Sequence, residues 1–202
     1  MNVLDLFGKV TTYQTFKQTG LPLFHVSIFR HRVGESIITG RSLSHPHTRF
    51  FEANPPPELM ANADFMARHS AESVFEQVRA SQYLRLPSRK HALFASIAME
   101  DALSWKEKDT RKNGLVYELT LDDSSTLTLV DVGWFNHAVR LNKTTPTPDK
   151  LLLRSGGTLQ DELLAAAGNY WAGARLEQYG SVGRTEVLIR GVARIVREIS
   201  SV

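Results

Sequence analysis

Residues 115–132 read LVYELTLDDSSTLTLVDV, and this stretch decides the predicted fold class. Two segments, 115–121 and 126–132, alternate or run apolar, and the polar residues 122–125 separate them. Such a pattern is typical of two antiparallel strands joined by a tight turn. The strand-like segments of the chain do not alternate regularly with helices. We therefore predict an α+β fold and not a doubly wound α/β fold.

Further strands are predicted on both sides of this pair. Residues 21–30 (LPLFHVSIFR) alternate in polarity, and His25 lies in the middle of the more polar face, where we expect a cleft. The other strand-like segments are 36–39, 91–96, 185–190 and 192–199.

Three helical regions are also predicted. Residues 58–80 have helical composition, and we expect two helices divided near Ser70. Residues 97–108 show a helical apolar stripe. Thr158 and Asp161 form an acidic variant of a capping box, which predicts a helix from there to about Tyr179.

Composition indicates an ordinary globular chain. Of the 202 residues, 42% are hydrophobic and 22% are charged, and we expect a single domain over 1–202 with residues 1–20 as an N-terminal extension. The absence of cysteine excludes disulfides and cysteine nucleophiles. No apolar run approaches the roughly 18 residues of a membrane span, so we expect a soluble cytoplasmic protein without membrane contact. The net charge of +3 is only weakly favourable to nucleic acid.

Several catalytic and ligand-binding motifs are missing from the sequence. It contains neither a P-loop nor a G-x-G-x-x-G loop, neither H-E-x-x-H nor a G-x-S-x-G nucleophile elbow. The segment His45-Pro46-His47 is a candidate for two metal ligands, but such a pair is more often an exposed loop, and we expect no metal.

Three phrases occur in the order typical of one enzyme superfamily. They are FHVS at 24–27, HALFAS at 91–96 before a helix ending near Trp105, and TEVLIRG at 185–191. In this order the chain resembles the mono-ADP-ribosyltransferases, including bacterial toxin, defence and rifampin-modifying members. The resemblance implies a split antiparallel β-sheet core with flanking helices, and NAD as co-substrate.

The resemblance implies two catalytic residues. His25 matches the histidine that contacts the NAD ribose, and Glu186 matches the glutamate that stabilises the cationic transition state. Ser27, two residues after His25, is expected to face the same cleft. The alternatives are a core histidine satisfied by backbone atoms and an ordinary strand-edge glutamate.

Four more residues are predicted to bind NAD. Leu93 or Phe94 is in the place of the family's stacking tyrosine, and Phe94 can supply a stacking face, with an ordinary core phenylalanine as the alternative. Tyr83 is a second candidate for that role, and Ser96 lies where the strand leads into a helix. Arg89 is expected to meet the pyrophosphate from a polar approach to this strand, with solvated surface as the alternative. Asn169-Tyr170-Trp171 is a weaker candidate for a cleft wall.

The acceptor of ADP-ribose is not readable from the residues. Arginine-modifying members carry a glutamate two positions before the catalytic one, and this chain has Arg184 there. We therefore expect a non-arginine acceptor on a protein, a nucleic acid or a small molecule. The roles implied by the resemblance are those of a toxin, with an antitoxin or another protein as partner, or of a phage-defence or counter-defence factor. The competing hypothesis is a non-catalytic interaction or nucleic-acid-binding protein with a degenerate fold of this type.

Overall fold

Two antiparallel four-stranded sheets form the centre of the molecule. The computed structural model describes residues 1–39, 55–106, 114–143, 157–176 and 184–199. Sheet A has the order β1-β6-β7-β4, and sheet B has the order β2-β5-β8-β3. Sheet A consists of β1 (Thr11–Thr12), β6 (Thr126–Asp131), β7 (Thr185–Arg190) and β4 (Leu93–Ala95). Sheet B consists of β2 (Leu23–Ser27), β5 (Leu115–Leu121), β8 (Val192–Ile199) and β3 (Ser36–Ile38). The α+β class is confirmed.

The predicted hairpin over residues 115–132 is wrong. β5 pairs with β2 and β8 in sheet B, whereas β6 pairs with β1 and β7 in sheet A. The turn at 122–125 therefore carries the chain from one sheet to the other. The alternating pattern identified both strands correctly, but it contains no information about which partner each strand finds.

A second crossing between the sheets lies against the first. Gly191 (φ 135°) joins β7 to β8, and a Cβ there would lie 2.4 Å from Oγ of Ser125. The Ser125 hydroxyl donates to the carbonyl of Val192 at 3.1 Å and accepts from its N–H at 3.0 Å. Glycine is therefore required for the close approach of the two crossings.

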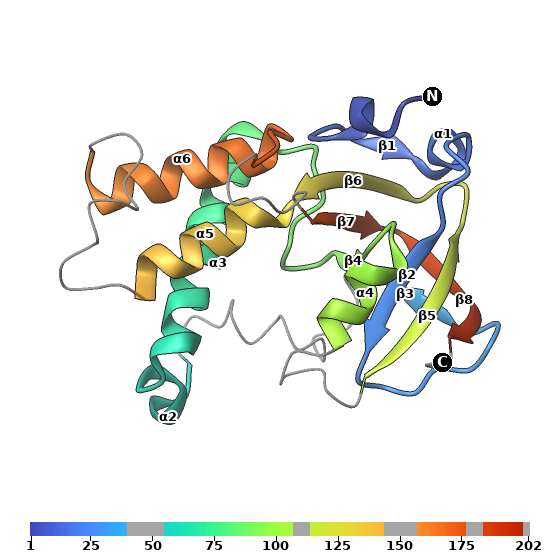
Figure 1. Cartoon of the computed structure of the whole chain (residues 1–202), viewed down its shortest axis with the longest axis horizontal. Coiled ribbons are helices and arrows are strands. Elements are labelled where there is room, and N and C mark those ends of the chain that lie inside the picture. Colours follow the sequence, from blue (N-terminus) through green and yellow to red (C-terminus); the bar gives the residue numbers. More distant parts are fainter. Residues whose placement is uncertain (40–54, 107–113, 144–156, 177–183, 200–202) are drawn as a thin grey trace.

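Three helices cover one face of sheet A (Figure 1). They are α3 (Ala63–Gln82), α5 (Val132–Lys143) and α6 (Leu159–Trp171), which pack against one another and on the sheet. The other face of sheet A packs on sheet B through a second apolar cluster. Because side chains alternate along a strand, successive residues of β7 point to different layers. Glu186 and Leu188 point toward the helices, and Val187 and Ile189 toward sheet B.

The helix boundaries correct part of the sequence analysis. The division near Ser70 is wrong, because α3 runs through it and begins instead at Asn62, whose Oδ1 accepts from the N–H of Phe65 at 2.9 Å. The short α2 (Pro57–Met60) precedes it. The capping box of Thr158 and Asp161 is confirmed, but α6 ends at Trp171 and not near Tyr179, which lies outside the described residues. α5 was not predicted.

The remaining elements lie at the N-terminus and beside sheet B. Residues 1–20, expected as an extension, include a 3₁₀ turn (Val3–Leu6), α1 (Tyr13–Lys17) and β1, and Thr11 and Thr12 of β1 pair with β6. α4 (Met99–Lys106) follows β4 and packs on β2 and β5. Phe24 and Ser96 exchange backbone hydrogen bonds of 2.8 Å in each direction, so the edges of the two sheets meet at β2 and β4.

Candidate functional site

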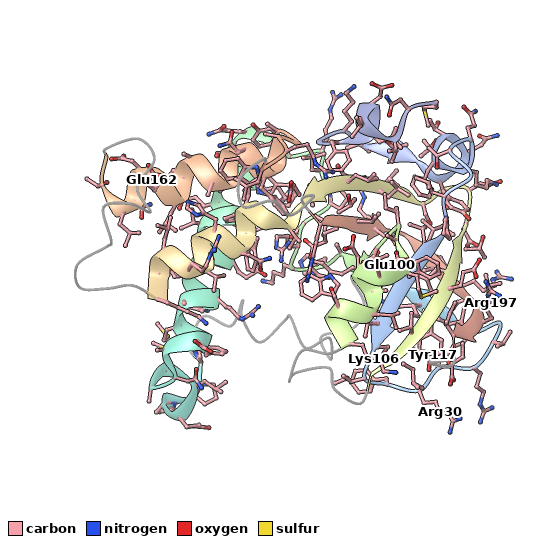
Figure 2. All side chains as sticks on the ribbon, viewed as in Figure 1. Arg30, Glu100, Lys106, Tyr117, Glu162 and Arg197 are labelled. Atoms are coloured by element: carbon pink, nitrogen blue, oxygen red, sulfur yellow. The ribbon has the colours of Figure 1, made fainter. Side chains whose placement is uncertain are left out.

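A pocket lies where the two sheets meet. Its walls come from β2, β4, α4 and β7, and its lining residues are Phe24, Val26, Phe94, Ala95, Ser96, Trp105 and Glu186. Figure 2 labels Glu100 and Lys106 on α4, the helix that lies against β2 beside this junction. The pocket therefore combines aromatic side chains, strand backbone and one carboxylate.

Glu186 supplies that carboxylate from the face of β7 that points to the helices. The residue is only 4% exposed. Its Oε2 accepts hydrogen bonds from the Tyr170 hydroxyl, at 2.7 Å, and from Nη1 of Arg89. Among the described residues, no hydrogen bond reaches Oε1. One carboxylate oxygen is thus fixed by protein donors, and the other remains for a ligand.

Arg89 connects Glu186 to the helical layer. Its Nε and Nη2 donate to the two oxygens of Glu72 on α3, at 2.8 and 3.0 Å, and its Nη1 donates to both Tyr170 and Glu186. The guanidinium carbon lies 4.9 Å from the ring centre of Phe94 and 4.2 Å from that of Phe135. We call Glu72, Arg89, Tyr170 and Glu186 the Arg89 network.

Arg89 does not lie at a solvated surface, which was the alternative to its predicted contact with the NAD pyrophosphate. The side chain is 2% exposed, and the hydrogen bonds to Glu72, Tyr170 and Glu186 use the three nitrogens of its guanidinium. A buried arginine is stable only when carboxylates compensate its charge and aromatic rings cover its faces, and both conditions are met here. Arg89 belongs to the site, but as the partner of Glu186.

The pKa values of three members of the Arg89 network are shifted from their usual values. Burial raises the pKa of Glu72, against the opposing effect of Arg89. Burial also raises the pKa of Tyr170 well above its usual value. The phenol therefore stays protonated and donates a hydrogen bond to Glu186. For Arg89, burial lowers the pKa, but Glu186 and Glu72 outweigh it and the pKa lies well above its usual value.

His25 lies on the other side of β2 from the pocket lining. Its Nδ1 is 2.8 Å from the carbonyl oxygen of Phe94, so the ring links β2 to β4. The pocket is lined by Phe24 and Val26, which alternate with it along the strand. His25 was expected on the more polar face of this strand, but all five residues of β2 are buried. α4 covers one face, and the cluster shared by the two sheets covers the other. Ribose binding by His25 stays a prediction.

The other predicted NAD contacts divide into two groups. Phe94 and Ser96 line the pocket. Ser27 does not, because its Oγ accepts from the N–H of Phe29 at 3.1 Å and contacts Nε2 of His31 at 3.1 Å. Tyr83 packs against the helical cluster and its hydroxyl donates to the carbonyl of Gly168 at 3.4 Å. The structure thus brings Phe94, Ser96 and Glu186 together.

Two residues of the site were not assigned their roles from sequence. Glu72 lies among the buried residues Ala71, Val74 and Phe75 of α3, and a charged residue within such a stripe is the sequence signal that could have pointed to it. Tyr170 was considered only as a cleft wall. Its hydroxyl instead bonds Glu186, whereas Nε1 of Trp171 donates to the backbone of α3.

The described ranges contain neither a metal-binding cluster nor a membrane-spanning helix. In those ranges no group of three or more potential ligands is placed to hold a metal ion. His45 and His47 lie outside the described residues. None of the helices in the described ranges is both long enough and apolar enough to cross a bilayer.

Comparison with known sequences identifies a family. No curated protein matches the chain. Residues 54–201, which include α3, β4, β7 and all four members of the Arg89 network, match a family described as "Protein of unknown function (DUF2441)". This match covers more than half of the 202 residues. The chain therefore belongs to the DUF2441 family.

Proposed function

We propose that the chain is a mono-ADP-ribosyltransferase that transfers ADP-ribose from NAD to a non-arginine acceptor. The observation that carries the proposal is the pocket at the sheet junction, where Glu186 has one oxygen held by Arg89 and Tyr170 and the other without a protein donor among the described residues. A preorganised carboxylate of this kind stabilises positive charge that develops during a reaction.

The proposed reaction breaks the bond between the ribose carbon and the nicotinamide nitrogen. The bonding electrons leave with nicotinamide, which departs as a neutral molecule, and the ribosyl carbon becomes cationic. Oε1 of Glu186 stabilises this charge. An acceptor then forms a bond to the same carbon and loses a proton. Because the carboxylate is already fixed before the charge develops, little reorganisation accompanies the reaction.

The pocket residues suit the nicotinamide end of NAD. Phe24, Phe94 and Trp105 offer aromatic surfaces to the ring. The carboxylate of Glu186 in the pocket lining suits a cationic pyridinium. Arg89 itself is committed to two carboxylates, so we do not assign it to the pyrophosphate.

Arg184 supports the proposed choice of acceptor. The residue is exposed just before β7, and its positive charge acts on Asp101 of α4, whose pKa is raised by burial and lowered by Arg184. A cation two residues before Glu186 disfavours docking of an arginine side chain. The toxin, defence and antitoxin roles rest on the sequence resemblance alone.

A non-catalytic function is the second candidate. The ion pair of Glu186 with Arg89 favours it, because that pair satisfies both buried charges without any ligand. The two candidates differ in whether NAD is cleaved.

Nicotinamide release from NAD by the purified chain tests the proposal. We expect the Glu186→Gln variant to lose roughly a hundredfold or more of the turnover with little change in NAD affinity. Asp123→Asn is the matched control, because Asp123 pairs with Lys17 in the exposed turn after β5 and should leave turnover unchanged. Absence of nicotinamide release with any candidate acceptor would overturn the proposal, and so would equal turnover in Glu186→Gln and wild type.

A further inference from the structure

The Arg89 network joins segments that are far apart in the sequence. Glu72 belongs to α3, Arg89 to the loop before β4, Tyr170 to α6 and Glu186 to β7. Glu72 and Glu186 are both hydrogen-bonded to Arg89 but are not bonded to each other. The hydrogen-bonded route from Glu72 to Glu186 therefore passes through the guanidinium, beside the direct repulsion between the two carboxylates.

Glu72 fixes the orientation of that guanidinium. Its two carboxylate oxygens accept hydrogen bonds from Nε and Nη2 of Arg89, an arrangement that matches the planar fork of arginine. Since the guanidinium is rigid, these two bonds determine where Nη1 points, and Nη1 is the nitrogen that reaches Glu186. Stacking on Phe135 and Phe94 limits tilting of the plane.

We propose that Glu72 is a positioning residue for Glu186. By orienting Arg89, it holds Oε2 of Glu186 within the network and leaves Oε1 directed to the pocket. Its effect on turnover rests on the proposed function, whereas the coupling between the two glutamates does not.

A purely structural role for Glu72 predicts something different. Glu76, one turn further along α3, also bonds an arginine through both oxygens, and it accepts from the Ser88 hydroxyl beside Arg89. It holds the same loop but touches no member of the network. If Glu72 only fastened this loop, Glu72→Gln and Glu76→Gln would have similar effects on turnover.

A double-mutant cycle on thermal unfolding tests the coupling without NAD. Glu72→Gln and Glu186→Gln each leave Arg89 with one carboxylate, whereas the double variant leaves a buried cation without either. We expect the fall in Tm of the double variant to exceed the sum of the single shifts by about 5 °C or more. The pair Glu76→Gln and Glu186→Gln should be additive. Additive shifts in both pairs would overturn the proposal.

A third substitution keeps this test decisive when the double variant does not fold. Adding Arg89→Met removes the unpaired cation, so the triple variant should recover folding. Failure to recover would show that the unpaired cation is not the cause, and it would contradict the coupling.

Turnover measurements test positioning. Well below the melting temperature, Glu72→Gln should lower kcat for nicotinamide release by about tenfold to a hundredfold with little change in KM for NAD, because Glu186 is displaced. Glu76→Gln should leave kcat unchanged. Equal kcat values for wild type and Glu72→Gln would overturn the positioning role. A wild-type protein without turnover would instead overturn the proposed function, and the unfolding cycle would then decide the coupling alone.

Discussion

Two carboxylates one turn apart on α3 make the same contact in different surroundings. Glu72 holds Arg89, which is 17 residues away in the sequence, and both side chains are 2% exposed. Glu76 holds Arg79, three residues away, and the pair is 25% and 13% exposed. The first pair joins the helices to sheet A, whereas the second closes the end of α3 and its following loop. Identical chemistry therefore serves long-range assembly in one place and local structure in the other.

Burial explains why the two pairs should respond differently to damage. A buried ion pair has lost its hydration, so removal of one partner leaves a charge that nothing compensates. A half-buried pair regains water when one partner is lost, and its net contribution is small. The Arg89 network has the additional feature that one cation serves two carboxylates.

Substitution of the two arginines, one at a time, should give the largest difference in stability between the two ion pairs. Arg89→Met leaves Glu72 and Glu186 buried without their cation, and we expect the free energy of unfolding to fall by about 3–5 kcal/mol. Arg79→Met removes the half-buried partner of Glu76 and bonds to the carbonyls of Leu84 and Leu86, so a loss of about 1 kcal/mol is expected. Urea unfolding followed by circular dichroism measures both. Similar losses would show that burial does not distinguish the two pairs.

The pH dependence of stability should show the cost of burying Glu72. Burial raises the pKa of Glu72 above 4.5, so the folded state binds this proton more tightly than the unfolded chain does. The contribution of this group to stability is present below the unfolded value and is lost as pH rises through the folded pKa. The free energy of unfolding of wild type, relative to that of Glu72→Gln, should therefore fall as pH rises above 4.5. A pH-independent difference, measured by urea unfolding, would contradict this effect.

Local patterns in the sequence predicted most strands and the start of α6. The alternation in residues 115–132 identified β5 and β6, and Thr158 with Asp161 identified the cap of α6. The pairing of β5 and β6 was wrong because alternation records which faces are buried and not which strand lies alongside. Ser70 was wrongly predicted to start a helix, because serine is a preferred N-cap residue but also occurs inside helices.

Residues of the candidate site could be predicted from the sequence only where they belong to a short recognisable motif. Glu186, Phe94 and Ser96 belong to such phrases, and all three line the pocket. The roles of Glu72 and Tyr170 depend on contacts with Arg89, which lies 17 and 81 residues away from them. No local periodicity encodes such contacts, because they arise only when helices and sheet pack together.

The contact between Glu35 and His31 extends the comparison to a carboxylate that is 43% exposed. Glu35, after β2, contacts Nδ1 of His31 at 3.0 Å and accepts from the N–H of Arg32 at 2.8 Å. The backbone bond, and then His31, lower the pKa of Glu35 below 4.5. The sign is opposite to that of Glu72, so the contribution of Glu35 is present above pH 4.5 and is lost as pH falls through the lower folded value. Relative to Glu35→Gln, wild type should lose a small amount of stability as the pH falls. Relative to Glu72→Gln, wild type should instead gain stability as the pH falls. Urea midpoints of the two variants across the same pH series make this comparison, and slopes of equal sign would show that burial does not govern the difference.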